Sequence, residues 1–141
     1  MRSERYYIDS NIVCFYAADM TEELTAEVRD IIEDHGIRKY VPSKCVEELI
    51  YLQQSGKINI KRWKSAEDII GYINDELSGI VYVTEKHLRR LARLPLFKEH
   101  KDPTDRIAIA QAIDDKIPII SSDRQFPIYK RCGLEIVFNK R

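Results

Sequence analysis

Carboxylates stand at the ends of two predicted strands and at the start of a predicted helix. Asp9 directly follows residues 6–8, a short aromatic and β-branched run, and Asp123 follows residues 119–122. Asp105 lies in the first turn of the helix expected before the second of these strands. In a parallel sheet, ligands bind beyond the carboxyl ends of the strands. We therefore expect these three side chains to meet at one edge of a sheet.

A fourth carboxylate shares the apolar face of a predicted helix. Positions 45, 48, 49 and 52 lie on one helical face, which places Glu48 among apolar residues instead of on the solvated side. A carboxylate in such a place is costly unless it has a partner. The alternatives are that Glu48 reaches solvent or pairs with Lys44. Glu47 remains the neighbouring candidate for the same role.

Four carboxylates at one edge predict a bound cation. The set is Asp9, Glu48, Asp105 and Asp123. Like charges this close repel strongly, and a cation relieves the repulsion. Oxygen ligands without histidine or cysteine select Mg²⁺ or Mn²⁺ over zinc. Such an ion activates water and neutralises charge on a phosphodiester, so the pattern indicates metal-assisted phosphodiester hydrolysis by one or two ions.

The same acids also have structural interpretations. Asp9 and Asp123 are good N-caps for the helices they precede, an interaction worth about 0.5–2 kcal/mol each. Asp102 and Pro103 look like the cap and first residue of a helix, with Asp105 placed favourably against the helix dipole. Capping and metal binding are therefore both open for each aspartate.

Strand and helix patterns alternate along the chain, and this alternation sets where the acids lie. Strands are expected over residues 5–9, 38–41, 80–83, 117–121 and 134–138. Helices are expected over residues 12–18, 21–35, 43–56, 65–77, 84–94 and 102–115, with a brief one opened by Asp123. Parallel strands need crossover connections, which helices supply. We predict one α/β domain over residues 1–141, with a mostly parallel central sheet of four to five strands and helices on both faces.

Composition limits the cellular setting. Lys and Arg number 23, as do Asp and Glu, so the net charge is zero and a uniformly basic nucleic-acid-binding surface is excluded. The three cysteines are widely spaced and form no C-x-x-C pair, which fits a reducing cytoplasm better than a disulfide framework. No apolar run approaches the roughly 18 residues of a membrane span. We expect a soluble cytoplasmic protein with no membrane partner.

Four segments resemble, in order, the motifs of PIN-domain ribonucleases, especially the VapC-like toxins. They are Y-I-D-S-N (residues 7–11), P-S-K-C-V-E-E-L (42–49), H-K-D-P-T-D-R-I-A-I-A-Q-A (100–112) and S-S-D-R-Q-F (121–126). They span nearly the whole chain. The third motif, followed by a strand and S-x-D, is fairly specific, and the four together are a strong signal.

The resemblance implies roles for particular residues. It implies that the four acids named above are the catalytic, metal-binding set, and that Asn11 and Ser122 are polar neighbours that orient ligands or water. It further implies Mg²⁺ or Mn²⁺ dependence and cleavage of RNA to a 3′-hydroxyl and a 5′-phosphate. The basic stretch of residues 57–64 departs from the minimal motifs and leaves the choice of RNA open.

Basic residues are candidates for contact with RNA phosphates. Arg106 and Arg124 each follow a site acid, and Trp63 within residues 57–64 is a candidate for stacking on a base. The alternative is that residues 57–64 and 86–101 are solvated helix faces, with Trp63 packed beneath its own helix. His100 is expected at the surface.

The predicted function is that of a metal-dependent endoribonuclease, the toxin of a toxin–antitoxin pair. The resemblance implies an RNA substrate, an antitoxin partner protein and a homodimer. Two alternatives stay open: a catalytically silent PIN-fold module that binds a protein partner, and an RNA-processing nuclease outside any toxin–antitoxin system.

Overall fold

Five parallel strands form the central sheet of the computed structural model, which describes residues 3–141. The strands are β1 (Arg5–Ile8), β2 (Arg38–Pro42), β3 (Ile80–Val81), β4 (Ile119–Ser121) and β5 (Ile136–Phe138). Their order across the sheet is β3-β2-β1-β4-β5, which makes β1 the middle strand. The predicted α/β fold is confirmed, and each pair of neighbouring strands is parallel.

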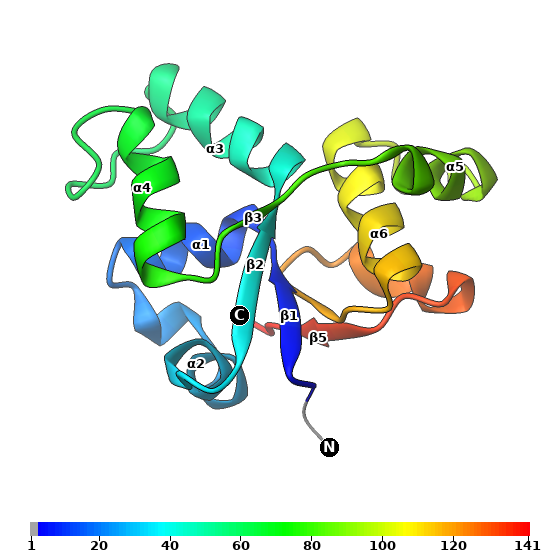
Figure 1. The fold of residues 1–141 in the computed structure, drawn as a ribbon, viewed down its shortest axis with the longest axis horizontal. Helices are drawn as coiled ribbons and strands as arrows, with labels where there is room; N and C mark the ends of the chain where they lie inside the picture. The colour runs from blue at the N-terminus through cyan, green and yellow to red at the C-terminus, as the bar shows by residue number, and fades with distance from the viewer. Residues whose placement is uncertain (1–2) are drawn as a thin grey trace.

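Helices cover both faces of this sheet (Figure 1). One side carries α1 (Ser10–Ala17), α2 (Ala26–Glu33) and α4 (Glu67–Glu76), and the other carries α5 (Glu85–Arg93) and α6 (Pro103–Asp115). Helix α3 (Ser43–Gln54) contacts α1, α4 and α6. Two short 3-10 helices, η1 (Thr21–Glu23) and η2 (Phe126–Cys132), complete the chain. This layering follows from the parallel sheet, because both of its apolar faces must be covered.

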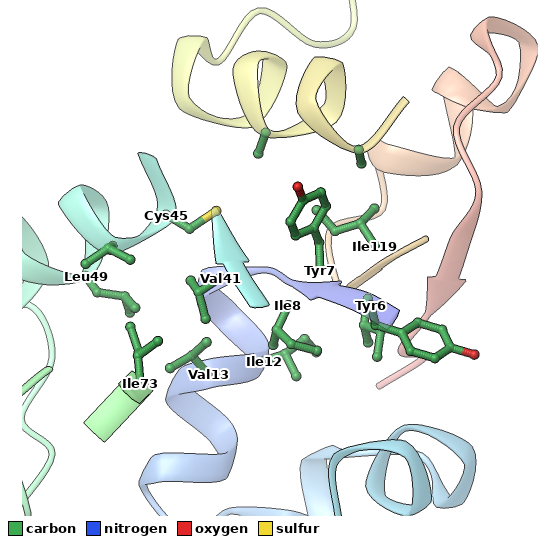
Figure 2. Close-up of a cluster of buried hydrophobic side chains, with 14 of the residues drawn as sticks. Tyr6, Tyr7, Ile8, Ile12, Val13, Val41, Cys45, Leu49, Ile73 and Ile119 are labelled. Atoms are coloured by element: carbon green, nitrogen blue, oxygen red, sulfur yellow. The ribbon is translucent and has the colours of Figure 1, made fainter. Parts of the chain in front are cut away.

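Strand β1 joins the two halves of the core. Tyr6 and Ile8 point to one face of the sheet, and Tyr7 points to the other, toward α6 (Figure 2). All three side chains are buried, as expected for a central parallel strand. The Tyr7 hydroxyl donates to Asp115 Oδ2 over 2.5 Å and so ties the middle strand to the last residue of α6. Asp9 emerges directly from the carboxyl end of this anchored strand.

Helix α6 is buried over seven consecutive residues, 107–113. Asp102 caps its start, because Asp102 Oδ1 accepts from the Asp105 backbone N–H over 3.0 Å, and Pro103 follows in the first turn. The helix ends at Lys116, whose φ of 57° is left-handed. The predicted cap and boundaries are thus confirmed, and they place Asp105 in the first turn of the helix.

The helix predicted over residues 21–35 is wrong as a single element. Residues 21–23 form η1, and the α-helix begins after Thr25, whose Oγ1 accepts from the Val28 backbone N–H over 3.2 Å. The Thr25 backbone N–H donates to Asn139 Oδ1 over 2.7 Å. The break therefore depends on a residue 114 positions away, which local periodicity does not reveal.

Other predicted boundaries shift by a few residues. The third strand stops at Val81 instead of residue 83, because it pairs with β2 only at Ile80 and Val81. Asp123 does not open an α-helix: its Oδ1 accepts from the Gln125 backbone N–H over 2.8 Å, and the 3-10 helix η2 follows. All three cysteines are free, as predicted. Within residues 3–141, no helix has the length and apolar character that crossing a bilayer requires.

Asn139 fastens the last strand to the segments around the site. The buried Asn139 amide donates to the Glu23 carbonyl and to Ser122 Oγ, both over 2.8 Å, and accepts from Thr25. Every polar atom of this side chain is thereby satisfied. The amide links β5, the start of α2 and the residue that follows β4.

We expect Asn139→Ala to lower the free energy of unfolding by about 1–3 kcal/mol, because it leaves the Thr25 N–H without its partner. Urea denaturation measures the change. Asn74→Ala on the exposed side of α4 is the matched control and is expected to shift stability by no more than about 0.5 kcal/mol. Equal midpoints for the two variants would show that the Asn139 contacts contribute little.

Candidate metal centre

The four predicted acids line a single cleft. It lies beyond the carboxyl ends of β1 and β4, which pair side by side, and its volume is about 440 Å³. Asp9 follows β1, Glu48 lies in the second turn of α3, Asp105 in the first turn of α6, and Asp123 follows β4. The remaining lining residues are Ser10, Asn11, Cys14, Phe15, Leu52 and Asp102. The cleft lining therefore carries five carboxyl groups and no basic side chain.

Asp9 is the most deeply placed of these acids, with 2% of its surface exposed. Its Oδ1 accepts from the Ser10 backbone N–H over 2.8 Å, which is the predicted helix cap. Its Oδ2 accepts from Ser121 Oγ over 2.7 Å and from Asn11 Nδ2 over 3.2 Å. Burial raises the pKa of Asp9 to about 6, against the lowering effect of the Ser121 and Ser10 hydrogen bonds. The capping and cleft-lining roles thus coexist in one side chain.

The geometry separates Glu48 from Glu47. Glu48 is half-buried in the cleft, where Ser10 Oγ donates to Glu48 Oε1. Glu47 is exposed and pairs with Lys44 over 3.3 Å, outside the cleft. Lys44 therefore pairs with Glu47 and not with Glu48, which was the alternative. Helical phase explains the outcome, since position 48 shares its face with the buried Cys45 and Leu49.

The pKa of Asp105 is raised further than that of Asp9. Burial raises the pKa of its carboxyl well above the usual range, and the charges of Asp9, Asp102, Asp123 and Glu48 raise it further. Asp105 Oδ2 lies 3.0 Å from His100 Nε2. Burial and repulsion therefore favour the protonated form of Asp105 over a pH range in which an isolated aspartate is ionised. A nearby cation would favour the ionised form instead.

The donor set matches a hard cation. Ligand atoms of His100, Asp105 and Asp123 lie within 4.8 Å of one another, close enough to share an ion. Asp9 and Glu48 add carboxylate oxygens across the same cleft. Oxygen-rich sites of this kind suit hard divalent cations.

The two predicted polar neighbours are placed differently. Asn11 Nδ2 donates to Asp9, and its Oδ1 accepts from the Ser122 backbone N–H over 3.2 Å. The Ser122 hydroxyl, however, accepts from Asn139 and does not contact an acid. Ser121 is the serine that donates to Asp9, and its Oγ also accepts from the Asp123 backbone N–H over 3.0 Å. The motif S-S-D allowed either serine; in the structure Ser121 is the buried last residue of β4, whereas Ser122 follows the strand and is half-buried.

His100 is buried, contrary to the expected surface position. Its ring is 5% exposed and packs edge-on against Phe126 and Tyr129. Position 100 precedes α6 in a loop, where the sequence has no periodicity that would reveal burial. The sequence carries one sign of the contact with Asp105: His100 precedes it by five residues, just before the capped start of α6.

Two further candidates are placed away from the cleft. The Arg106 guanidinium donates to the carbonyls of Pro95 (2.7 Å) and Leu94 (3.3 Å), which does not support its predicted contact with phosphate. Trp63 is 3% exposed and packs edge-on against Tyr72 with ring centroids 5.6 Å apart, so the packed alternative holds. Arg124 is exposed and lines a neighbouring groove.

The raised carboxyl pKa values predict a stability that falls with pH. Asp9 and Asp105 bind protons more tightly in the folded chain than in the unfolded chain, where an aspartate has a pKa of about 3.9. Their stabilising effect is complete below that value and is lost as the pH rises through the folded values. In divalent-free buffer, we expect the urea midpoint to fall steadily between pH 5 and pH 8, and Mn²⁺ to restore it most at the higher pH.

We expect Asp105→Asn to reduce the pH dependence of the urea midpoint, because it removes one of the two carboxyl groups whose pKa is raised. Asp75→Asn, on the exposed side of α4, is the control and retains the wild-type slope. A wild-type midpoint that stays constant or rises over this range, with the same slope in Asp105→Asn, would refute the electrostatic description of the cleft.

Solved structures of VapBC2, VapBC-1 and FitAcB share this fold. VapBC2 from Rickettsia felis, bound to a promoter DNA fragment, superposes with a TM-score of 0.70 at 14% identity, covering 96% of this chain and 99% of that chain. VapBC-1 from nontypeable Haemophilus influenzae gives 0.65 at 13% identity, with coverages of 95% and 97%. FitAcB from Neisseria gonorrhoeae gives 0.62 at 14%, with coverages of 95% and 96%. At these identities the likeness is one of fold.

Sequence comparison identifies the family. A search of curated proteins finds no match. The family model described as PIN domain matches residues 6–131, a span that contains all four predicted acids and the cleft they line. Because this match covers most of the sequence, the chain belongs to the PIN domain family.

Proposed function

We propose that this protein is a Mg²⁺- or Mn²⁺-dependent endoribonuclease that hydrolyses RNA phosphodiester bonds. The observation that carries the proposal is the convergence of Asp9, Glu48, Asp105 and Asp123, from four separate elements, on one cleft without a basic lining residue. Such convergence costs folding energy, as the raised pKa values of Asp9 and Asp105 indicate. A bound cation would offset this cost, which gives the most direct physical explanation for the convergence of the four acids.

The carboxylates supply what such an ion needs. Asp9, Glu48, Asp105 and Asp123 would hold it, and Mg²⁺ or Mn²⁺ suits an oxygen donor set better than zinc does. When bound, the ion lowers the pKa of a water nucleophile and neutralises charge on the phosphate. The water oxygen bonds to phosphorus while the bond to the 3′-oxygen breaks. The 3′-oxygen takes a proton, and the products are a 3′-hydroxyl and a 5′-phosphate.

The role of the chain is to fix its acids before substrate arrives. Asp9 is held by Ser10, Asn11 and Ser121, and Glu48 is held by the Ser10 hydroxyl. Each of these hydrogen bonds restricts one carboxylate without neutralising it. The acids therefore present fixed oxygens at a spacing set by β1, β4 and α3, so little reorganisation is needed on binding.

A basic groove beside the cleft supports an RNA substrate. It has a volume of about 580 Å³ and is lined by Arg124, Lys140 and Arg141, with Glu23 as the acid among its lining residues. The Arg141 guanidinium lies 4.6 Å from the ring centroid of Phe15, which also lines the acidic cleft. Arg141 is paired with Glu23 over 3.0 Å, so a strand cut in the cleft would place its flanking phosphates along Arg124 and Lys140.

The wider role proposed is that of a toxin in a toxin–antitoxin pair. The support is the family membership together with the fold shared with VapBC and FitAcB complexes, which are assemblies of two proteins. By the same likeness we propose an antitoxin partner and a homodimer. Full retention of the acids in a formed cleft favours an active enzyme over a silent binding module.

Substitution of neighbouring glutamates tests the catalytic assignment. We expect Glu48→Gln, Asp9→Asn and Asp105→Asn to reduce RNA cleavage by at least about 100-fold, because each loses a charged ligand oxygen. Glu47→Gln, one residue away and outside the cleft, is expected to stay within about twofold of wild type. Gel analysis of a labelled RNA measures cleavage, and circular dichroism checks the fold.

Equal activity in Glu47→Gln and Glu48→Gln would contradict the proposed site. Failure of the wild-type protein to bind Mn²⁺ in calorimetry would contradict the enzyme itself and favour the silent module.

The groove predicts a change in the salt dependence of RNA binding. For Arg124→Ala and Lys140→Ala, we expect weaker binding of RNA, with the slope of log affinity against log salt reduced by about 0.7 for each lost phosphate contact. The rate at saturating RNA is expected to stay unchanged. Arg89→Ala on α5 is the control, because Arg89 is exposed and pairs with Glu85. An unchanged slope in both groove variants would remove this surface from the RNA path.

A further inference from the structure

His100 forms a buried link between the aromatic core and the acidic cleft. Its Nδ1 lies 2.8 Å from the Tyr129 hydroxyl, and its Nε2 lies 3.0 Å from Asp105 Oδ2. The ring is held from both sides, since Phe126 and Tyr129 pack edge-on against it. His100 is therefore fixed in position and uses both ring nitrogens in hydrogen bonds.

The acceptor at Asp105 sets the direction of these bonds. A carboxylate that holds a metal ion is ionised and can only accept, so His100 Nε2–H donates to Asp105 Oδ2. An imidazole with its proton at Nε2 has an acceptor at Nδ1, to which the Tyr129 hydroxyl donates.

A second histidine shows what the same contact does elsewhere. His87 Nδ1 accepts from the Thr84 backbone N–H over 3.0 Å, and His87 Nε2 lies 2.9 Å from both oxygens of Asp115. Lys86 and Arg90 lie beside that pair and bind the adjacent Asp114. There the charges are already balanced, and the contact joins α5 to α6. Asp105, in contrast, is surrounded by other carboxylates.

We propose that His100 is a positioning residue for the metal centre, which holds one oxygen of Asp105 through Nε2–H so that the other is presented to a divalent cation. The inference rests on the metal-binding part of the proposed function and not on RNA cleavage. It completes a pattern in which the cleft acids are pinned by hydrogen-bond donors: Asp9 by Ser10, and Asp123 by the Gln125 backbone N–H. Such outer partners of metal ligands typically contribute about 10–100-fold to metal affinity or activity.

Two substitutions separate hydrogen bonding from packing. His100→Gln retains an amide that can accept from Tyr129 and donate to Asp105, whereas His100→Met fills the space without a donor. Both lose the aromatic ring, so both share its packing loss. By calorimetry with Mn²⁺ alone, we expect His100→Gln to bind within about threefold of wild type, and His100→Met to bind about 10–100-fold more weakly.

His87→Met provides the matched control. It removes the equivalent contact to Asp115 and is expected to lower the urea midpoint while leaving Mn²⁺ affinity unchanged. Equal Mn²⁺ affinity in wild type, His100→Met and His87→Met would overturn the proposal. An equal loss in His100→Gln and His100→Met would also overturn it, because packing alone would then explain the effect.

Measurements on the unaltered protein keep the test independent of variant folding. Long-range ¹H–¹⁵N correlation spectra of the Mg²⁺-loaded protein are expected to show the proton of the His100–Asp105 hydrogen bond on Nε2. Electron spin echo spectra of bound Mn²⁺ are expected to show no coupling to a directly coordinated nitrogen. The Nδ1–H tautomer, or a nitrogen bonded to Mn²⁺, would overturn the positioning role.

Cleavage assays then distinguish this proposal from the proposed function. With RNA as substrate, His100→Met is expected to lower kcat about 10–100-fold at fixed Mn²⁺ while KM for RNA changes less than about twofold. A fall in RNA affinity with unchanged kcat would overturn the inference. If the wild-type protein binds Mn²⁺ but cleaves no RNA, the endoribonuclease proposal fails, and the calorimetric comparison still tests His100.

Discussion

Electrostatic repulsion among carboxylates at the end of β1 is the constraint on which the rest of the site depends. Asp9 is buried there because it both caps α1 and closes the carboxyl end of the middle strand. Its pKa of about 6 reflects the cost of that burial. Four hydrogen-bond donors, from Ser10, Asn11, Cys45 and Ser121, keep it in place. This arrangement of acids lowers the stability of the fold at neutral pH. It also fixes the carboxylates before any ligand binds.

The acids could be predicted because their positions follow from periodicity and topology. Parallel strands place Asp9 and Asp123 at one edge, and helical phase places Glu48 on the inner face of α3. The capping interpretations were also correct for Asp9 and Asp102, and they do not compete with the cleft, since a carboxylate has a second oxygen. Asp9 therefore caps α1 and still lines the cleft.

The hydrogen-bond partners could not be predicted, because they depend on long-range contacts. Ser121 contacts Asp9 across 112 positions, and Asn139 splits the helix expected over residues 21–35 from 114 positions away. His100 lies in a loop whose burial comes from η2, a segment well beyond it in the sequence. Arg106 had the right spacing for phosphate contact, but its guanidinium binds the carbonyls of Leu94 and Pro95.

The zero net charge of the whole chain hides a local separation of charge, with an acidic cleft and a groove lined by Arg124, Lys140 and Arg141. The central claim is that the cleft binds a divalent cation, and anomalous diffraction from crystals soaked in Mn²⁺ tests it most directly. We predict a manganese peak within coordination distance of Asp9, Asp105 and Asp123 oxygens. A cleft without anomalous signal at saturating Mn²⁺, or a peak only at the His87 and Asp115 pair, would contradict it.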